Sequence, residues 1–328
     1  MTYQVTTAPH PEMPELTAVT LSSADHDFEV TFVPAAGMVG ASLISAGQEV
    51  LGQRKGLAAY CAGGHTFGIP LLAPWANRLV ANVFDGVELV TDGTPGVHLD
   101  ENGLPIHGLL AGATFTVTRC EAINSGDQPG AWLVAELDFG PDRPDFAAFP
   151  FPHTLEVSVR VVHSRVDLKT TIRATGDARV PIAFGWHPYF APPGADRQDW
   201  TLAQPFAHSV VLDTRSVPTG EVLRVPVSVD VLGDPARGGL TYDNLYSQVA
   251  PGTRCFLEGG KHRITVTYDS GYPYAILYAP AEDDVVAIEP MTAPTDPLAG
   301  AFDIRAVDPG QSFSAQYSIA VTASGVGL

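Results

Sequence analysis

The segment LEVSVRVVH, residues 155–163, alternates apolar and polar side chains along its length. The segment VDLKTTIRAT, residues 166–175, repeats this alternation after a break at Ser164 and Arg165. A period of two is typical of a β-strand with one face in the core, and two such runs around a short break indicate a hairpin. This pair therefore predicts antiparallel β-structure.

Further runs rich in Val, Ile, Thr, Tyr and Phe lie on both sides of this hairpin, separated by Gly, Pro, Asp and Asn. They cover residues 28–33, 114–119, 132–139, 208–212, 263–268, 274–278, 285–288 and 312–321. No segment carries a helical apolar stripe over three turns, and the strands do not alternate with helices, which argues against a parallel α/β sheet. We expect an all-β protein, a large sandwich or barrel whose loops carry the site.

The composition is compatible with one large domain. Of the 328 residues, 45% are hydrophobic and 16% charged, which suits a globular core. The 32 Gly and 28 Pro are spread along the chain, which indicates many turns and few long helices. The Pro-rich stretch 141–152 contains interleaved phenylalanines, which predict a packed loop and not a linker. We therefore expect a single domain covering residues 1–328.

Charge and cysteine content exclude several classes of partner. The formal net charge is −18, so phosphate backbones and anionic lipid surfaces would be repelled. Cys61, Cys120 and Cys255 form no C-x-x-C pair and fit free thiols in a reducing compartment. The sequence shows neither a signal-peptide pattern nor an 18-residue apolar run. These features predict a cytoplasmic monomer or homodimer that binds a small molecule, not nucleic acid or a membrane.

Four segments place an ionisable residue among apolar, Pro- or Gly-stiffened neighbours, and two lie in the first third of the chain. Asn77 and Arg78 follow the Pro-Trp turn of GIPLLAPWANRL (68–79), and arginine offers a fixed fork of donors for oxygen ligands. His107 lies in LPIHGLL (104–110). Taken alone, such an arginine more often forms an ion pair with an acidic residue, and a histidine in an apolar run is more often a satisfied core residue.

The other two segments follow in the second half. His187 lies among aromatic residues in IAFGWHPYF (182–190), where burial and a nearby carboxylate would act in opposite directions on its pKa. Glu289 ends the apolar run of VVAIEPMTAPTDPL (285–298). A buried carboxylate costs free energy unless it is paired, so it needs a salt-bridge partner or a catalytic task. Phosphate-loop, dinucleotide-turn, nucleophile-elbow and zinc-helix motifs do not occur.

The ordered set PWANRL, IHG, GWHPYF and IEPMTAPTDP resembles the motifs of the aldose 1-epimerase family, also called galactose mutarotases. The resemblance spans residues 68–298 and implies a β-supersandwich that binds a monosaccharide in a cleft on its face. It implies no metal and no organic cofactor. It also implies that Glu289 is the catalytic base and His187 the catalytic acid.

The same resemblance implies the residues that contact the sugar. Arg78 and His107 match residues that hold the ring oxygen and hydroxyls. Asp243 in TYDNLY matches an aspartate that binds hydroxyls, and its alternative is a simple turn residue. We also assign Asn77 and the apolar platform of Trp186 to substrate binding.

The implied reaction interconverts the α and β anomers of a free aldohexose through acid–base ring opening and closure. Three alternatives remain open at this point. One is a non-catalytic sugar-binding or regulatory protein with the same fold, and another is a mutarotase for a phosphorylated or sulfonated sugar that uses Arg54 and Lys55. The third is a glycosidase or lyase, although glycosidases normally pair two carboxylates across the bond. The residues around both histidines differ from those of galactose-specific members, so the resemblance leaves the preferred sugar open.

Overall fold

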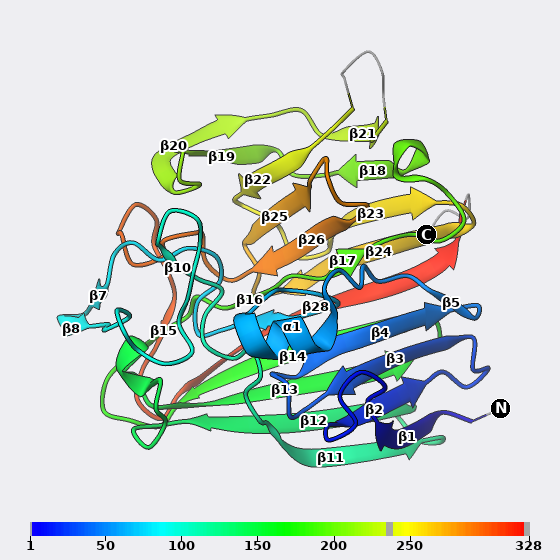
Figure 1. Cartoon of the computed structure of the whole chain (residues 1–328), viewed down its shortest axis with the longest axis horizontal. Coiled ribbons are helices and arrows are strands. Elements are labelled where there is room, and N and C mark those ends of the chain that lie inside the picture. The colour runs from blue at the N-terminus through cyan, green and yellow to red at the C-terminus, as the bar shows by residue number, and fades with distance from the viewer. Residues whose placement is uncertain (1, 234–238, 325–328) are drawn as a thin grey trace.

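The computed structural model describes residues 2–233 and 239–324 and consists mainly of β-strands (Figure 1). Its helices are short: α1 (Gly56–Gly63) and two 3-10 turns, η1 (Phe146–Ala148) and η2 (Arg197–Asp199). Across these two described ranges, no helix is long and apolar enough to cross a membrane. The predicted all-β class is confirmed.

The hairpin predicted from the alternating segments is present as β13 (His153–Val162) and β14 (Arg165–Ala174). The two strands pair antiparallel along their whole length. Their turn is formed by His163 and Ser164, one residue earlier than the predicted break. His163 has a φ of 53°, the left-handed conformation that two-residue hairpin turns use.

A 9-stranded antiparallel sheet contains this hairpin. In spatial order its strands are β11 (Thr116–Ile123), β12 (Gly130–Phe139), β13, β14, β28 (Ser312–Ala323), β24 (His262–Ser270), β23 (Thr253–Gly259), β18 (Thr201–Gln204) and β21 (Ser228–Val231). Buried and less buried residues alternate along β13 and β14, because one face of the sheet lies in the core.

An 8-stranded sheet carries Trp186, Asp243 and Glu289, and His187 lies between two of its strands. In spatial order its strands are β20 (Pro218–Arg224), β19 (His208–Leu212), β22 (Tyr242–Tyr246), β25 (Tyr274–Ala279), β26 (Val286–Met291), β16 (Gly185–Trp186) and β6 (Leu71–Leu72), with β17 (Tyr189–Phe190) also paired to β26. Every residue of β26 is buried, so this strand lies at the centre of the fold.

Smaller sheets complete the structure. A 5-stranded sheet comprises β1 (Gln4–Pro9), β2 (Thr17–Ser22), β3 (Phe28–Val33), β4 (Val39–Ser45) and β5 (Gln48–Glu49). Three two-stranded pairs are β7 (Val83–Phe84) with β8 (Val87–Glu88), β9 (His98–Leu99) with β10 (Pro105–Ile106), and β15 (Val180–Pro181) with β27 (Ala306–Val307). Figure 1 shows β7, β8 and β10 gathered at one end of the large sheets, on the left of the view.

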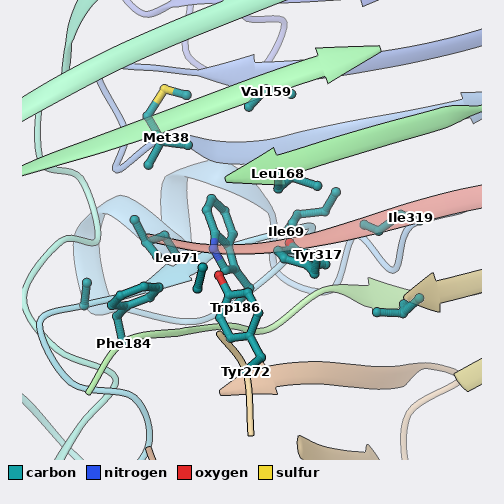
Figure 2. Packing of buried hydrophobic residues seen from close by; sticks show 14 of the residues in the cluster. Met38, Ile69, Leu71, Val159, Leu168, Phe184, Trp186, Tyr272, Tyr317 and Ile319 are labelled. Carbon is teal, nitrogen blue, oxygen red and sulfur yellow. The ribbon is translucent and has the colours of Figure 1, made fainter. Parts of the chain in front are cut away.

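The core lies between the two large sheets. Trp186 of β16 packs against Tyr317 of β28 with ring centroids 5.9 Å apart, and its Nε1 donates to Thr170 Oγ1 of β14 at 3.0 Å. Figure 2 shows the same indole within the buried cluster that also contains Leu168 and Ile319. Because the indole comes from one sheet and its partners from the other, these contacts join two layers into a β-sandwich.

Of two local predictions, the packed loop at 141–152 is confirmed and the strand at 285–288 has different bounds. The Pro-rich stretch 141–152 does pack against the body, since Phe149 and Phe151 are buried with ring centroids 5.0 Å apart. The strand predicted at 285–288 is longer, because β26 continues through Glu289 to Met291. Glu289 therefore lies within a strand and does not end one.

We expect Leu168→Ala to lower the free energy of unfolding by about 2.7–5 kcal/mol, because this fully buried side chain would leave a cavity between the sheets. Val229→Ala is the control, since Val229 on the edge strand β21 is 65% exposed. It should change the same quantity by less than about 0.5 kcal/mol. Denaturant unfolding followed by circular dichroism measures both, and equal effects would contradict the assigned core.

Candidate active site

A cleft of about 400 Å³ is lined by loops from the first third of the chain and by strands β22, β25 and β26. Six of the seven residues selected from the sequence line it: Asn77, Arg78, His107, His187, Asp243 and Glu289. The fold thus brings together ionisable side chains from separate sequence segments. Such convergence of polar groups in one concave site is typical of ligand-binding pockets.

His187 and Glu289 form a buried hydrogen-bonded pair in this cleft. Gly185 of β16 lies opposite Met291 of β26, and β17 pairs with the same strand two residues after His187. This register places His187 directly opposite Glu289. The His187 Nε2 lies 3.0 Å from the Glu289 Oε1, and the two side chains are 7% and 1% exposed.

Burial dominates the proton affinities of this pair. It raises the pKa of Glu289 well above that of a free carboxyl group, and the negative charge of Asp243 raises this pKa further. Burial also lowers the pKa of His187 well below that of free imidazole, with His107 and the Arg54 guanidinium acting in the same direction. Both shifts favour the neutral forms, an imidazole beside a carboxylic acid with one proton between them.

Asp100, which no sequence motif singled out, fixes the orientation of Arg78. Its Oδ2 accepts from Arg78 Nε at 2.6 Å, and its Oδ1 accepts from the backbone N–H groups of Asn102 and Leu104 at 2.8 Å each. Burial alone would raise the pKa of Asp100, but the Leu104 N–H, the Arg78 guanidinium and the Asn102 N–H hold it below its usual range. An ionised carboxylate thus holds the guanidinium at the cleft.

Asn77 and His107 are held together in unusual backbone conformations. Both are left-handed, with φ of 56° and 64°, and His107 N–H donates to the Asn77 carbonyl at 3.0 Å. Non-glycine residues persist in this region where the surroundings impose it, commonly at functional sites. Burial, with the charge of Arg78, lowers the pKa of His107 to about 3, so the ring is neutral. In the described ranges the buried His107 Nδ1 and Asn77 Nδ2 have no protein hydrogen-bond partner, as expected of groups that bind a polar ligand.

Asp243 and Trp186 have different positions. Asp243 of β22 pairs with Tyr278 of β25 and is exposed at the rim of the cleft. Trp186 is fully buried and points into the core (Figure 2). Consecutive strand residues face opposite sides, so His187 takes the cleft side and Trp186 the core side. The assignment of Trp186 to substrate binding is therefore corrected: it supports the sheet behind the cleft.

The sequence model of the aldose 1-epimerase family matches residues 20–320. The chain belongs to the aldose 1-epimerase family. No curated protein sequence matches it. Among the described residues, no group of three His, Cys, Asp or Glu side chains is arranged to hold a metal ion.

Solved structures share the aldose 1-epimerase fold at low sequence identity. A galactose mutarotase-like protein from Clostridium acetobutylicum has a TM-score of 0.79 at 16% identity, over 98% of this chain and 99% of that one. A galactose 1-epimerase from Lactobacillus acidophilus has a TM-score of 0.74 at 16% identity, with 98% and 99% covered. A GalM/aldose epimerase homologue from C. elegans gives 0.73, again at 16% identity with 98% and 99% covered. These likenesses establish the galactose mutarotase-like sandwich.

This aldose 1-epimerase family member has a second polar group beside His187 that sequence analysis missed. Tyr189 Oη lies 3.2 Å from His187 Nε2, and Thr66 Oγ1 is 2.7 Å from the same hydroxyl. Arg54 donates to this hydroxyl from Nη1 at 2.7 Å and pairs with Asp283 at 3.0 Å. The available signal was the two-residue spacing between His187 and Tyr189, which places both on one face of a strand.

Gly108 allows the His107 loop to lie directly on the neighbouring loop. Its φ is 72°, and a Cβ at this position would lie 2.1 Å from the carbonyl oxygen of Ala73. The next residue, Leu109, donates its N–H to that oxygen at 2.8 Å. Only glycine is compatible with this approach, because any other residue would be strained in this conformation and its side chain would have no room.

We expect Gly108→Ala to lower the free energy of unfolding by more than about 2 kcal/mol, through both backbone strain and the clash with Ala73. Gly86→Ala is the matched control, because Gly86 has a φ of 78° and a Cβ added there would meet nothing within 4 Å. That control should cost only about 1–2 kcal/mol of left-handed strain. Denaturant titration compares the two, and an equal loss would show that the close approach contributes nothing.

Proposed function

We propose that this protein is an aldose 1-epimerase that interconverts the anomers of a free aldohexose, with Glu289 as base and His187 as acid. The observation that carries the proposal is the 3.0 Å contact between His187 Nε2 and Glu289 Oε1 in the cleft. The anomeric hydroxyl and the ring oxygen of a sugar are bonded to the same carbon, so an acid and a base this close together reach both. The family match supports the same reaction class.

In the proposed mechanism, the proton of the pair first moves from Glu289 to His187 across their hydrogen bond. The Glu289 carboxylate then accepts the proton of the anomeric hydroxyl while His187 donates its proton to the ring oxygen. The bond between C1 and the ring oxygen breaks, and a C1 carbonyl forms. Rotation about C1–C2 then presents the other carbonyl face. Closure reverses both proton transfers, so the enzyme ends with the same single shared proton. Positioned acid–base groups of this kind typically contribute about 10² to 10⁴ in rate.

The remaining polar groups of the cleft are suited to holding the sugar. Arg78, oriented by Asp100, presents a rigid set of donors, and His107 is a neutral ring with one donor and one acceptor nitrogen. The Asn77 amide adds a buried donor, and the Asp243 carboxylate at the rim is an acceptor for hydroxyls. Sugar hydroxyls require this mixture of donors and acceptors.

Charge pairing favours an uncharged sugar over a phosphorylated or sulfonated one. Arg54 is paired with Asp283 at 3.0 Å, and Arg78 with Asp100 at 2.6 Å. Each arginine that lines the cleft is thus already offset by a carboxylate. Lys55 is exposed at the rim, where its charge is solvated. An anionic substrate would need a stronger local excess of positive charge.

We expect Glu289→Gln to slow anomer exchange by about 10² to 10⁴-fold, because an amide cannot take up the hydroxyl proton. Stability should be kept or increased. A pKa raised in the folded state means that stability is lost as pH rises through that pKa, and the neutral amide removes this loss. Two-dimensional exchange NMR of anomeric protons, with glucose, galactose and less common aldoses, measures the rate. Thermal unfolding at pH 5 and pH 8 measures the stability.

The matched control is Glu282→Gln, the same change at an exposed residue a few positions before β26. It should alter neither exchange nor unfolding. Exchange that persists in Glu289→Gln would remove the base assignment. A wild-type protein that accelerates no aldose, yet broadens sugar resonances, would instead be the non-catalytic sugar-binding protein.

We expect Asp100→Asn to raise KM about tenfold with little change in kcat, because it releases the Arg78 guanidinium from its charged partner. The dependence of the exchange rate on sugar concentration separates the two constants. A fall in kcat with KM unchanged would mean that Arg78 acts on the transition state and not on binding.

A further inference from the structure

Tyr189 is packed directly on the proposed acid. Its ring stacks on that of His187 with centroids 4.3 Å apart and an interplanar angle of 25°, and its Oη lies 3.2 Å from Nε2. The same oxygen contacts Thr66 Oγ1 and Arg54 Nη1, each at 2.7 Å. Tyr189 is 2% exposed, so water does not replace these partners.

Counting donors and acceptors defines how this group behaves. A guanidinium only donates, so the Tyr189 oxygen accepts from Arg54. The hydroxyl then has one hydrogen and one lone pair left for its two other neighbours, Thr66 and His187. Arg54 and Thr66 therefore fix the place of the hydroxyl, and its contact with Nε2 lies beside the shorter one, 3.0 Å, from Nε2 to Glu289 Oε1.

We propose that Tyr189 is a positioning residue for His187: its stacked ring and its hydroxyl, held by Arg54 and Thr66, fix the imidazole so that Nε2 can give its proton to the sugar. The inference rests on the proposed acid role of His187. Tyr189 keeps its own proton throughout, so the network neither gains nor loses one.

Arg54 gives this network a permanent charge. It is held by Asp283, and its guanidinium carbon lies 4.7 Å from the centroid of the Tyr189 ring. Burial raises the pKa of Tyr189 and outweighs the opposing effect of Arg54, so the phenol stays protonated. The positive charge also disfavours the imidazolium form of His187, which makes that form a stronger acid.

The titratable and charged groups that face His187 are Glu289, Tyr189, His107, Tyr278 and Arg54, with Asp243 acting through Glu289. The His107 ring is 5.6 Å away and neutral, and the Tyr278 ring is 6.1 Å away. Arg54 is therefore the cation in this set whose charge does not change with pH.

Arg54→Met and Arg54→Lys test the charge. Without it the imidazolium is less disfavoured, so the pKa values of the His187–Glu289 pair should rise and both limbs of the kcat profile should move upward by about one pH unit. Arg54→Lys keeps the charge and should leave both limbs near their wild-type positions. A purely structural role would lower activity in both variants without moving the limbs.

Tyr189→Phe and Thr66→Val test the hydroxyl. Tyr189→Phe should lower kcat about tenfold and change KM less than about twofold, because the hydroxyl contacts the acid and not the sugar. Thr66→Val should cause a smaller loss, since it removes one of the two groups that hold the hydroxyl and leaves Arg54 in place. Tyr278→Phe is the matched control: it removes a hydroxyl from another ring facing His187, makes no hydrogen bond to it among the described residues, and should not move the pH limbs.

Nitrogen-15 NMR titration of His187 in the sugar-free protein measures its pKa without turnover. An active enzyme whose His187 pKa and pH limbs are unchanged in Arg54→Met, and whose kcat is unchanged in Tyr189→Phe, would overturn the positioning role and leave the proposed function standing. A wild-type protein that turns over no aldose would overturn the proposed function and the role built on it. In that case the change in the His187 pKa caused by Arg54→Met still measures the electrostatic effect of Arg54 on His187.

Discussion

Glu289 and His187 are ionisable and buried, and they form a hydrogen bond with each other. The sheet around them has to hold the two side chains at that distance. Buried charge is costly unless its partner is held at a fixed distance. The fully buried strand β26 provides this rigidity. Thr292, just after β26, donates from both N and Oγ1 to the Phe184 carbonyl, at 3.0 and 2.6 Å. These bonds lock the register, and a slip of one residue would turn His187 into the core and Trp186 into the cleft.

The loops that bring Arg78 and His107 to this pair depend on the same strands. β6 pairs with β16, so the loop that follows β6 starts at the edge of the sheet. Asp296, beyond β26, accepts from the backbone N–H groups of Val80 and Ala81 at 2.9 and 2.8 Å. The sequence motifs are therefore bonded to one another through the backbone.

Local patterns were sufficient to predict antiparallel sheets, because alternation can be read along the chain, while the resemblance of the ordered motifs to the family implied the supersandwich and the pair Glu289 and His187. Local patterns were insufficient where pairing with strands far away in the sequence decides whether a residue is buried and which face of the sheet it occupies. β4 contains Gly, Ala and Ser and is buried on both faces for most of its length, so it has no alternation to detect. Trp186 was placed on the wrong face because register is set by partner strands. Asp100 and Arg54 carry no motif, and the contact of Arg54 with Tyr189 spans 135 positions.

The proposed reaction proceeds in both directions through one open-chain form, so acid and base have to exchange roles at little cost. In water an imidazole binds a proton more tightly than a carboxylate does. Burial acts on the two groups in opposite senses, raising the pKa of Glu289 and lowering that of His187, so their proton affinities approach each other. Asp243 and Arg54 act in the same senses and strengthen this match. A proton that moves at little cost across the 3.0 Å contact would let the pair act on either anomer.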